Sequence, residues 1–246
     1  MTVHFQVYVS QLIELNFDVK AANEIGFLLS KKLIKRELII DQCIIFGCEK
    51  AFETKIVFNF AGGTHHAFSN SGEAFCLLND QAIAAQYLLN HKFASKILII
   101  DLDVHQGNGT ADIFSNNNTV FTFSMHGKTN YPFKKEISDL DIALNDHTKD
   151  QEYLSILTEI LPKLIAKQKP DFIFYLAGVD ILASDKLGKL SCTIEGCKKR
   201  DTFVLSLYQK FKIPVQVSMG GGYSPEIKTI IEAHANTFRA ARNIYY

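Results

Sequence analysis

The chain has 246 residues, of which 47% are hydrophobic and 21% are charged. Lys and Arg balance Asp and Glu at 26 each, so bulk charge gives no reason to expect binding to nucleic acid or to an anionic membrane surface. No apolar stretch approaches the roughly 20 residues that a membrane span needs, and no signal-peptide pattern opens the chain. We therefore expect a soluble protein that buries a sizeable core.

The five cysteines form neither a disulfide framework nor a zinc-finger pattern. Cys43 and Cys48 are separated by four residues, as are Cys192 and Cys197, and Cys76 stands alone. An odd number of cysteines without a C-x-x-C pair favours free thiols in a reducing compartment. We expect a cytoplasmic location.

Hydrophobic periodicity predicts an alternation of strands and helices after an irregular start. The first 54 residues have spacing compatible with helices over 5–15 and 22–35, and with a helix or a short strand over 37–46. Strands are then predicted over 56–60, 97–101, 119–125, 171–176 and 213–219, helices over 77–89, 151–167, 195–210 and 225–239, and a loop over 130–148. This order predicts an α/β fold with a parallel sheet flanked by helices, in one domain over residues 1–246.

Polar motifs follow four of the predicted strands directly. They are His65-His66, Asp103 with His105, Asp180, and Gly220-Gly221-Gly222-Tyr223. In a parallel sheet these positions all fall on the carboxyl edge, where ligand crevices form. We therefore expect the four motifs to meet in one place.

The second of these motifs has the character of a metal site. Asp101, Asp103 and His105 lie two residues apart at a strand end, so their side chains share one face. Asp103, His105 and Asp180 supply the three protein ligands of a catalytic zinc that keeps one position open for water. Because Asp and His also serve as turn and cap residues, a purely structural strand end is the alternative for this stretch alone.

The adjacent histidines suit proton transfer beside such a metal. His65 and His66 can share the roles of general base and general acid, and Asp101 and Asn108 can each hold the second nitrogen of one imidazole. Adjacent histidines also occur in polar loops and in incidental metal sites, so this pair alone leaves those alternatives open.

Tyr223 follows three glycines, which allow a tight bend and close approach to a ligand. Its phenol can donate to the oxyanion that forms when water attacks a carbonyl. An ordinary glycine turn with a packing tyrosine is the alternative, and a phosphate-binding loop is a weaker one. Phe75 can line a channel or belong to the core.

Five motifs together resemble the series that characterises the zinc-dependent histone deacetylase superfamily. They are Gly62-Gly63-Thr64-His65-His66-Ala67, Ala74-Phe75-Cys76-Leu77-Leu78-Asn79-Asp80, residues 101–109, Ala177-Gly178-Val179-Asp180 and Gly220-Gly221-Gly222-Tyr223. The match covers about residues 50–245, and the motifs stand in the expected order. The stretch from Asp103 to Gly109 is most similar to class IV and related bacterial members.

The resemblance implies an arginase-like α/β fold and a role for each motif residue. It implies zinc ligation by Asp103, His105 and Asp180, acid/base roles for His65 and His66, and carbonyl polarisation by Tyr223, with Asp101 holding His65 and Asn108 holding His66. It also places Phe75, Ala74 and Gly221 against the substrate, and a structural potassium among Asp101, Asp103, His105, Ser124 and Met125.

The chain also departs from the family pattern. Members usually begin with a strand, a His-containing loop and a helix, roughly fifty residues without a counterpart here, so we expect an unpaired sheet edge or an uncovered part of the core. Ala74 replaces a usual Gly, Ser71 a usual Arg, Leu28 a usual Pro, and Cys43-Ile44 a usual Gly-Thr.

Three hypotheses follow. The first is a zinc hydrolase that cleaves the amide of an acyl-lysine protein or of a small acylated amine, with acetyl or longer acyl groups. The second is a weak or inactive deacetylase-like binding protein, motivated by the amino-terminal departure. The third, a two-metal ureohydrolase, is disfavoured because position 107, where a second bridging carboxylate would be needed, is glycine.

Overall fold

The computed structural model describes residues 3–246, and its centre is a six-stranded sheet in the order β1-β6-β5-β2-β3-β4. Every neighbouring pair of strands is parallel. The strands are β1 (Ile56–Asn59), β2 (Ile97–Asp101), β3 (Val120–Gly127), β4 (Leu140–Leu144), β5 (Phe172–Leu176) and β6 (Val215–Ser218). The helices are α1 (Gln6–Glu14), α2 (Val19–Ile25), α3 (Lys31–Thr54), α4 (Asp80–Asn90), α5 (Asn108–Phe114), α6 (Asp150–Gln168), α7 (Ile194–Phe211) and α8 (Ile227–Tyr245).

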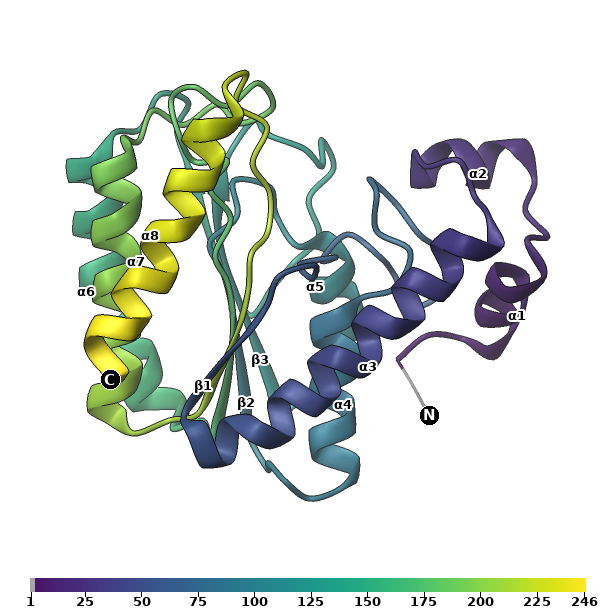
Figure 1. The fold of residues 1–246 in the computed structure, drawn as a ribbon, viewed down its shortest axis with the longest axis horizontal. Coiled ribbons are helices and arrows are strands. Elements are labelled where there is room, and N and C mark those ends of the chain that lie inside the picture. The colour runs from purple at the N-terminus through teal and green to yellow at the C-terminus, as the bar shows by residue number, and fades with distance from the viewer. Residues whose placement is uncertain (1–2) are drawn as a thin grey trace.

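Helices cover both faces of the sheet, as expected for an α/β fold (Figure 1). In β2, Leu98 and Ile100 pack in the cluster that includes side chains of α6, α7 and α8. Ile97 and Ile99 pack in the cluster that includes side chains of α3 and α4. Because alternate side chains of a strand point to opposite faces, a strand covered on both faces is apolar at every position.

The predicted alternation of strands and helices is confirmed, with differences at several boundaries. Residues 22–35 do not form one helix, because α2 ends at a left-handed Gly26 and α3 starts anew after Ser30, whose hydroxyl accepts from the Leu33 N–H. The segment 37–46 is helical throughout as part of α3. The predicted loop over 130–148 is wrong in its centre, where β4 pairs with β3. The short helix α5 was not predicted.

The strand β1 pairs on one side only, with β6, among the residues that the structure describes. Phe60, just beyond its end, is 70% exposed and stacks on Phe238 of α8 at a ring distance of 4.8 Å. Among the described residues β1 is therefore an edge strand of this sheet. No helix within residues 3–246 is long and apolar enough to span a bilayer.

The amino-terminal helices are joined to the sheet through His4. Its Nδ1–H donates to the Phe68 carbonyl (2.9 Å), and its Nε2 accepts from the Asn79 N–H (2.9 Å). The Asn79 side chain in turn caps α4 and donates to the Ala67 carbonyl at 3.1 Å. One neutral imidazole thus connects the start of the chain to the segment that follows His65 and His66.

This connection predicts a loss of stability in mild acid. Burial lowers the pKa of His4 from 6.5 to about 4, because a charged ring loses its solvation there. A protonated ring would also place a second N–H against the Asn79 N–H. The folded-state pKa lies below the unfolded one, so the free energy of unfolding falls as the pH drops below about 6.5. The contribution from His4 is about 1.5 kcal/mol between pH 6.5 and 5.

Urea unfolding of the wild-type chain and of His4→Gln at both pH values measures this contribution, because glutamine keeps a donor and an acceptor without titrating. We expect the variant to show a pH dependence smaller by about 1.5 kcal/mol. Equal pH dependence in the two proteins would contradict this role of His4.

Candidate active site

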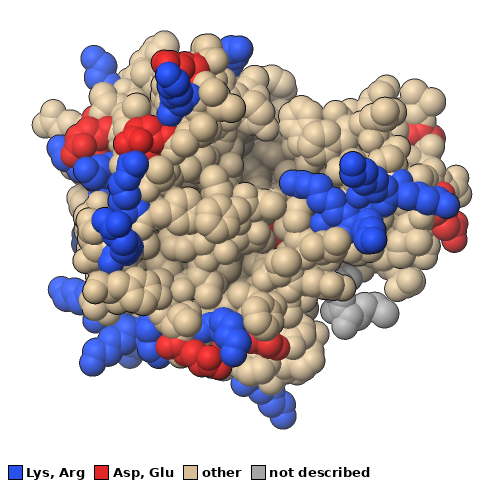
Figure 2. Space-filling view, viewed as in Figure 1, with Lys and Arg blue, Asp and Glu red and all other residues tan. Residues whose placement is uncertain are grey.

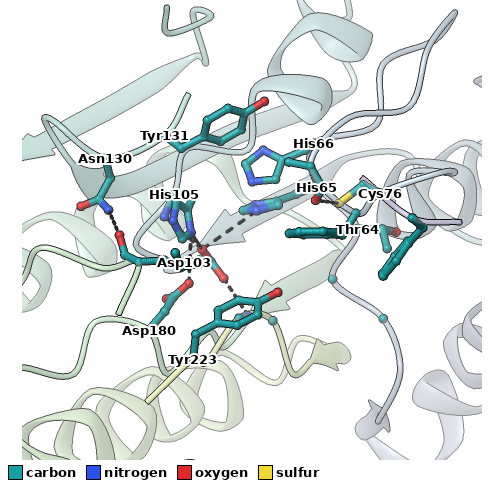
Figure 3. A pocket seen from close by; sticks show the side chains of 18 of the residues that line it. Thr64, His65, His66, Cys76, Asp103, His105, Asn130, Tyr131, Asp180 and Tyr223 are labelled. Carbon is teal, nitrogen blue, oxygen red and sulfur yellow. Dashed lines mark hydrogen bonds and ion pairs between the residues drawn. The ribbon is translucent and has the colours of Figure 1, made fainter. Parts of the chain in front are cut away.

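Two carboxylates and one imidazole meet at the carboxyl edge of the sheet, and we call these three side chains the ligand group because they could hold a metal ion. Asp103 and His105 follow β2, and Asp180 follows β5, which is the neighbour of β2. One ligand atom from each of the three lies within 4.8 Å of the others, and all three residues are buried. Figure 3 shows the two carboxylates converging on the His105 ring.

Backbone N–H groups hold each carboxylate in place. Asp103 Oδ2 accepts from the Gly221 N–H (2.8 Å), and Asp180 Oδ1 accepts from the Val104 N–H (2.9 Å). The remaining oxygens, Asp103 Oδ1 and Asp180 Oδ2, lie 3.0 and 3.2 Å from His105 Nδ1. One oxygen of each carboxylate therefore remains directed at a common point.

The two buried carboxylates favour a positive charge beside them. Burial, reinforced by the negative charge of Asp103, raises the pKa of Asp180 to about 7. Burial opposes a charge on His105, but its hydrogen bonds to the two carboxylates outweigh burial and raise its pKa to about 10. A positive charge beside the two carboxylates offsets their repulsion. Two carboxylate oxygens and one imidazole nitrogen are a donor set that could hold a small divalent cation.

His65 and His66 lie beside this group, with their ring centroids 4.1 Å apart (Figure 3). His65 Nδ1 is 2.6 Å from Asp101 Oδ2, and His66 Nδ1 is 2.6 Å from Asn108 Oδ1. An amide oxygen can only accept, so Nδ1 of His66 carries the hydrogen. In both rings Nδ1 is thereby occupied.

The pKa values of the two histidines shift in opposite directions because their partners differ. Burial opposes a charge on His65, but the Asp101 carboxylate outweighs burial and raises the pKa of His65 to about 9. Burial and the neighbouring charge of His65 hold the pKa of His66 well below its usual value. The pair therefore combines a group that retains its proton with a group that is free to accept one.

A cavity of about 560 Å³ lies over the ligand group and is lined by both histidines. Tyr223 and Tyr131 also line it, and Figure 3 shows them on opposite sides of the ligand group. The Tyr131 ring meets the His66 ring edge to face at 5.1 Å. The Tyr223 N–H donates to the Asp185 carboxylate (2.5 Å), which anchors the glycine turn that presents this side chain.

Ala74 and Phe75 form one wall of the cavity in an unusual backbone conformation. Their φ angles are 46° and 68°, in the left-handed region that non-glycine residues rarely adopt. Their N–H groups donate to the carbonyls of Glu24 (3.0 Å) and Ile25 (2.7 Å) at the end of α2. The end of α2 therefore helps to hold this wall in place.

The structure brings together most of the residues that the sequence singled out. The cavity is lined by His65, His66, Ala74, Phe75, Asp103, His105, Asp180, Gly221 and Tyr223. Asp101 and Asn108 lie behind the histidines as their hydrogen-bond partners. Ser124 and Met125 are buried in β3 and are not among the lining residues. Ser124 lies opposite Asp101 in the strand ladder and its hydroxyl is 2.9 Å from His126 Nδ1.

Gly221 has a structural reason to be glycine beyond facing the cavity. A Cβ atom there would lie 2.3 Å from Asp180 Oδ2 and 3.0 Å from Asp103 Oδ2. Since its N–H also holds Asp103, the backbone of Gly221 packs directly against the ligand group. Only a residue without a side chain allows this approach.

Arg200 supports the ligand group from the core and was not predicted from the sequence. It is fully buried, and its Nη1 donates to the carbonyls of Leu102 (3.2 Å) and Gly178 (2.7 Å). Leu102 precedes Asp103, and Gly178 lies two residues before Asp180. Arg200 Nε donates to Asp201 (2.8 Å), so the guanidinium is paired inside the core. One side chain therefore connects both ligand-bearing loops.

Comparison with known proteins gives one family. A model of the histone deacetylase domain matches residues 1–238. The chain is 43% identical over 243 residues to an uncharacterized protein of Picosynechococcus sp., covering 99% of this chain and 81% of that protein. It is 32% identical over 183 residues to human histone deacetylase 1, covering 70% of this chain but 37% of that enzyme. It is 29% identical over 194 residues to the acetoin utilization protein AcuC of Staphylococcus xylosus, covering 74% of this chain and 50% of that protein.

The close packing of Gly221 predicts that Gly221→Ala weakens metal binding by about 100-fold, because the new methyl group displaces Asp180. Chelator competition with Zn²⁺ measures the affinity. The control is Gly47→Ala in the middle of α3, where the Cβ would lie 3.6 Å from Val57 and where alanine adds about 0.5–1 kcal/mol of helix stability. Unchanged metal affinity in Gly221→Ala would contradict the geometry.

The contacts of Arg200 predict that Arg200→Lys lowers metal affinity about tenfold, because an ammonium cannot reach both carbonyls and Asp201 in one fixed fork. We also expect the free energy of unfolding to fall by about 2 kcal/mol. Arg239→Lys, which changes an exposed pair with Glu232, is the matched control. A loss of stability without any loss of metal affinity would show that Arg200 supports only the core and not the metal site.

Proposed function

The chain belongs to the histone deacetylase family, and on this premise we propose that it is a zinc-dependent amidohydrolase that removes acyl groups from lysine side chains or related amines. The observation that carries this proposal is the buried group of Asp103, His105 and Asp180 beside a histidine pair of opposite acidity. In our proposal the acyl-amine enters the cavity with its carbonyl over this group.

Zinc suits the donor set of Asp103, His105 and Asp180, which in our proposal are its three protein ligands. When bound, zinc supplies Lewis-acid chemistry, since it acidifies water and polarises a carbonyl. A single ion fits better than two, because even a Cβ atom at position 107 would lie 2.4 Å from Asp101 Oδ2, so a further bridging carboxylate has no room there.

The chain's own residues would divide the proton transfers. His66 is suited to be the base, since its lowered pKa keeps the ring unprotonated and Asn108 holds the hydrogen on Nδ1, which leaves Nε2 to accept a proton. His65 is suited to hold the proton that the leaving amine needs, since Asp101 keeps its pKa high. Tyr223 would donate a hydrogen bond to the developing oxyanion, and burial raises the pKa of its phenol so that it stays protonated.

Other residues would shape the acyl site and support the centre. Phe75 and Ala74 would form a wall of the acyl-binding channel, with Gly221 at its base. A structural potassium ion would be held around Asp101, Ser124 and Met125, a proposal supported by the position of Ser124 opposite Asp101 in the ladder between β2 and β3.

The decisive assay is hydrolysis of acetyl- to myristoyl-lysine peptides by the zinc-loaded chain. We expect Tyr223→Phe to lower kcat at least about 100-fold by removing the oxyanion donor, and His66→Ala to lower it by a similar factor or more. We expect the zinc stoichiometry to stay unchanged in both variants, and Tyr246→Phe, at an exposed tyrosine, serves as control.

The preferred acyl group in this assay measures the usable depth of the cavity. A folded, zinc-loaded chain that hydrolyses none of the peptides would contradict the proposed activity. It would favour the alternative of a deacetylase-like binding protein.

A further inference from the structure

Four cations lie together at the start of α3, beside the mouth of the cavity. Lys31, Lys32, Lys35 and Arg36 are all exposed, and Arg36 also lines the cavity. Figure 2 shows this cationic patch as a continuous blue surface next to the hollow of the molecule. The patch stands out because the chain as a whole has a formal net charge of zero.

The charges of the cationic patch are largely uncompensated within the chain. Lys31 and Lys35, like Lys32 and Arg36, are four residues apart on one helix and repel each other. Among residues 3–246, ion pairs of the patch are limited to that of Arg36 with Glu37, whose side chain is buried. The three lysines therefore remain available to an external anion.

A further cation lies at another part of the mouth. Lys189 is exposed, lines the cavity, and is held by the carbonyl (3.1 Å) and the hydroxyl (2.9 Å) of Thr129. The acidic residues of the lining, Glu37, Asp103 and Asp180, are all buried. Among the lining residues, the exposed charged side chains are therefore those of Arg36 and Lys189.

We propose that the site prefers acylated amines with carboxylates close to the acylated group, specifically acyl-lysine within an acidic peptide. This inference rests on the proposed function and adds the substrate class. From Lys31 to Lys35, and from Lys32 to Arg36, the helix rises about 6 Å on one face, which is close to two residues of an extended peptide, so carboxylates at alternate positions can meet successive cations. A nucleic acid would need a more extensive positive surface than one short patch on a chain of zero net charge.

The test compares acyl-lysine peptides flanked by Asp and Glu, by Ala and Ser, or by Lys and Arg, at 50 and 500 mM NaCl. At low salt we expect kcat/KM for the acidic peptide to exceed that for the neutral one about tenfold, with the basic peptide lowest. At high salt the preference falls to about twofold, because exposed ion pairs are screened. Lys31→Glu/Lys35→Glu removes or inverts the preference.

The matched control is Lys198→Glu/Lys199→Glu, which makes the same change in net charge on α7, across the sheet from α3 (Figure 1). We expect this control to keep the preference. Equal kcat/KM for the three peptides, or a preference that persists in Lys31→Glu/Lys35→Glu, would overturn the proposal. Salt-sensitive binding of a single-stranded oligonucleotide to the patch, with no preference among peptides, would overturn it in favour of nucleic acid.

Direct binding separates this inference from the proposed activity. Fluorescence anisotropy with the labelled peptides needs no turnover, so it tests the patch even if none of the peptides is hydrolysed. Tighter binding of the acidic peptide that is lost in Lys31→Glu/Lys35→Glu supports the patch, and equal binding of the three peptides refutes it. Absence of hydrolysis with intact binding would contradict the proposed function alone.

Discussion

Two buried carboxylates that face one imidazole are the constraint around which the rest of this structure is arranged. Asp103 and Asp180 carry like charges in a low-dielectric interior, which is costly unless a cation lies between them. Their other oxygens are held by backbone N–H groups, and Arg200 holds the loops that carry them. The surroundings therefore resist collapse of the pair and preserve a site that a divalent cation can fill.

The parallel sheet makes this arrangement possible from distant parts of the chain. The Gly221 N–H that holds Asp103 comes from a position 118 residues later in the sequence. Because all six strands run in the same direction, the loops after β1, β2, β5 and β6 emerge at one edge. The histidine pair, the carboxylates and Tyr223 are then neighbours without any long excursion of the backbone.

The sequence predicted that Asp103, His105 and Asp180 lie together beside the histidine pair, because polar side chains directly after apolar parallel strands lie at the carboxyl edge of the sheet. It missed β4 because this edge strand is only partly buried and has no strong apolar pattern. It missed α5, which has seven residues and no side-chain cap. Arg200 was also missed, since an arginine within an amphipathic helix is usually exposed, and its partners are carbonyls far away in the chain.

In our proposal Asp103, His105 and Asp180 together bind one metal ion. Anomalous diffraction at the zinc edge from crystals of the zinc-loaded chain tests it most directly, because it locates the ion independently of activity. We expect one strong peak bounded by the two carboxylates and the His105 ring, and the loss of this peak in crystals of Asp180→Asn. A zinc peak at another place, such as a cysteine, with none between these three residues, would show that they do not form the metal site.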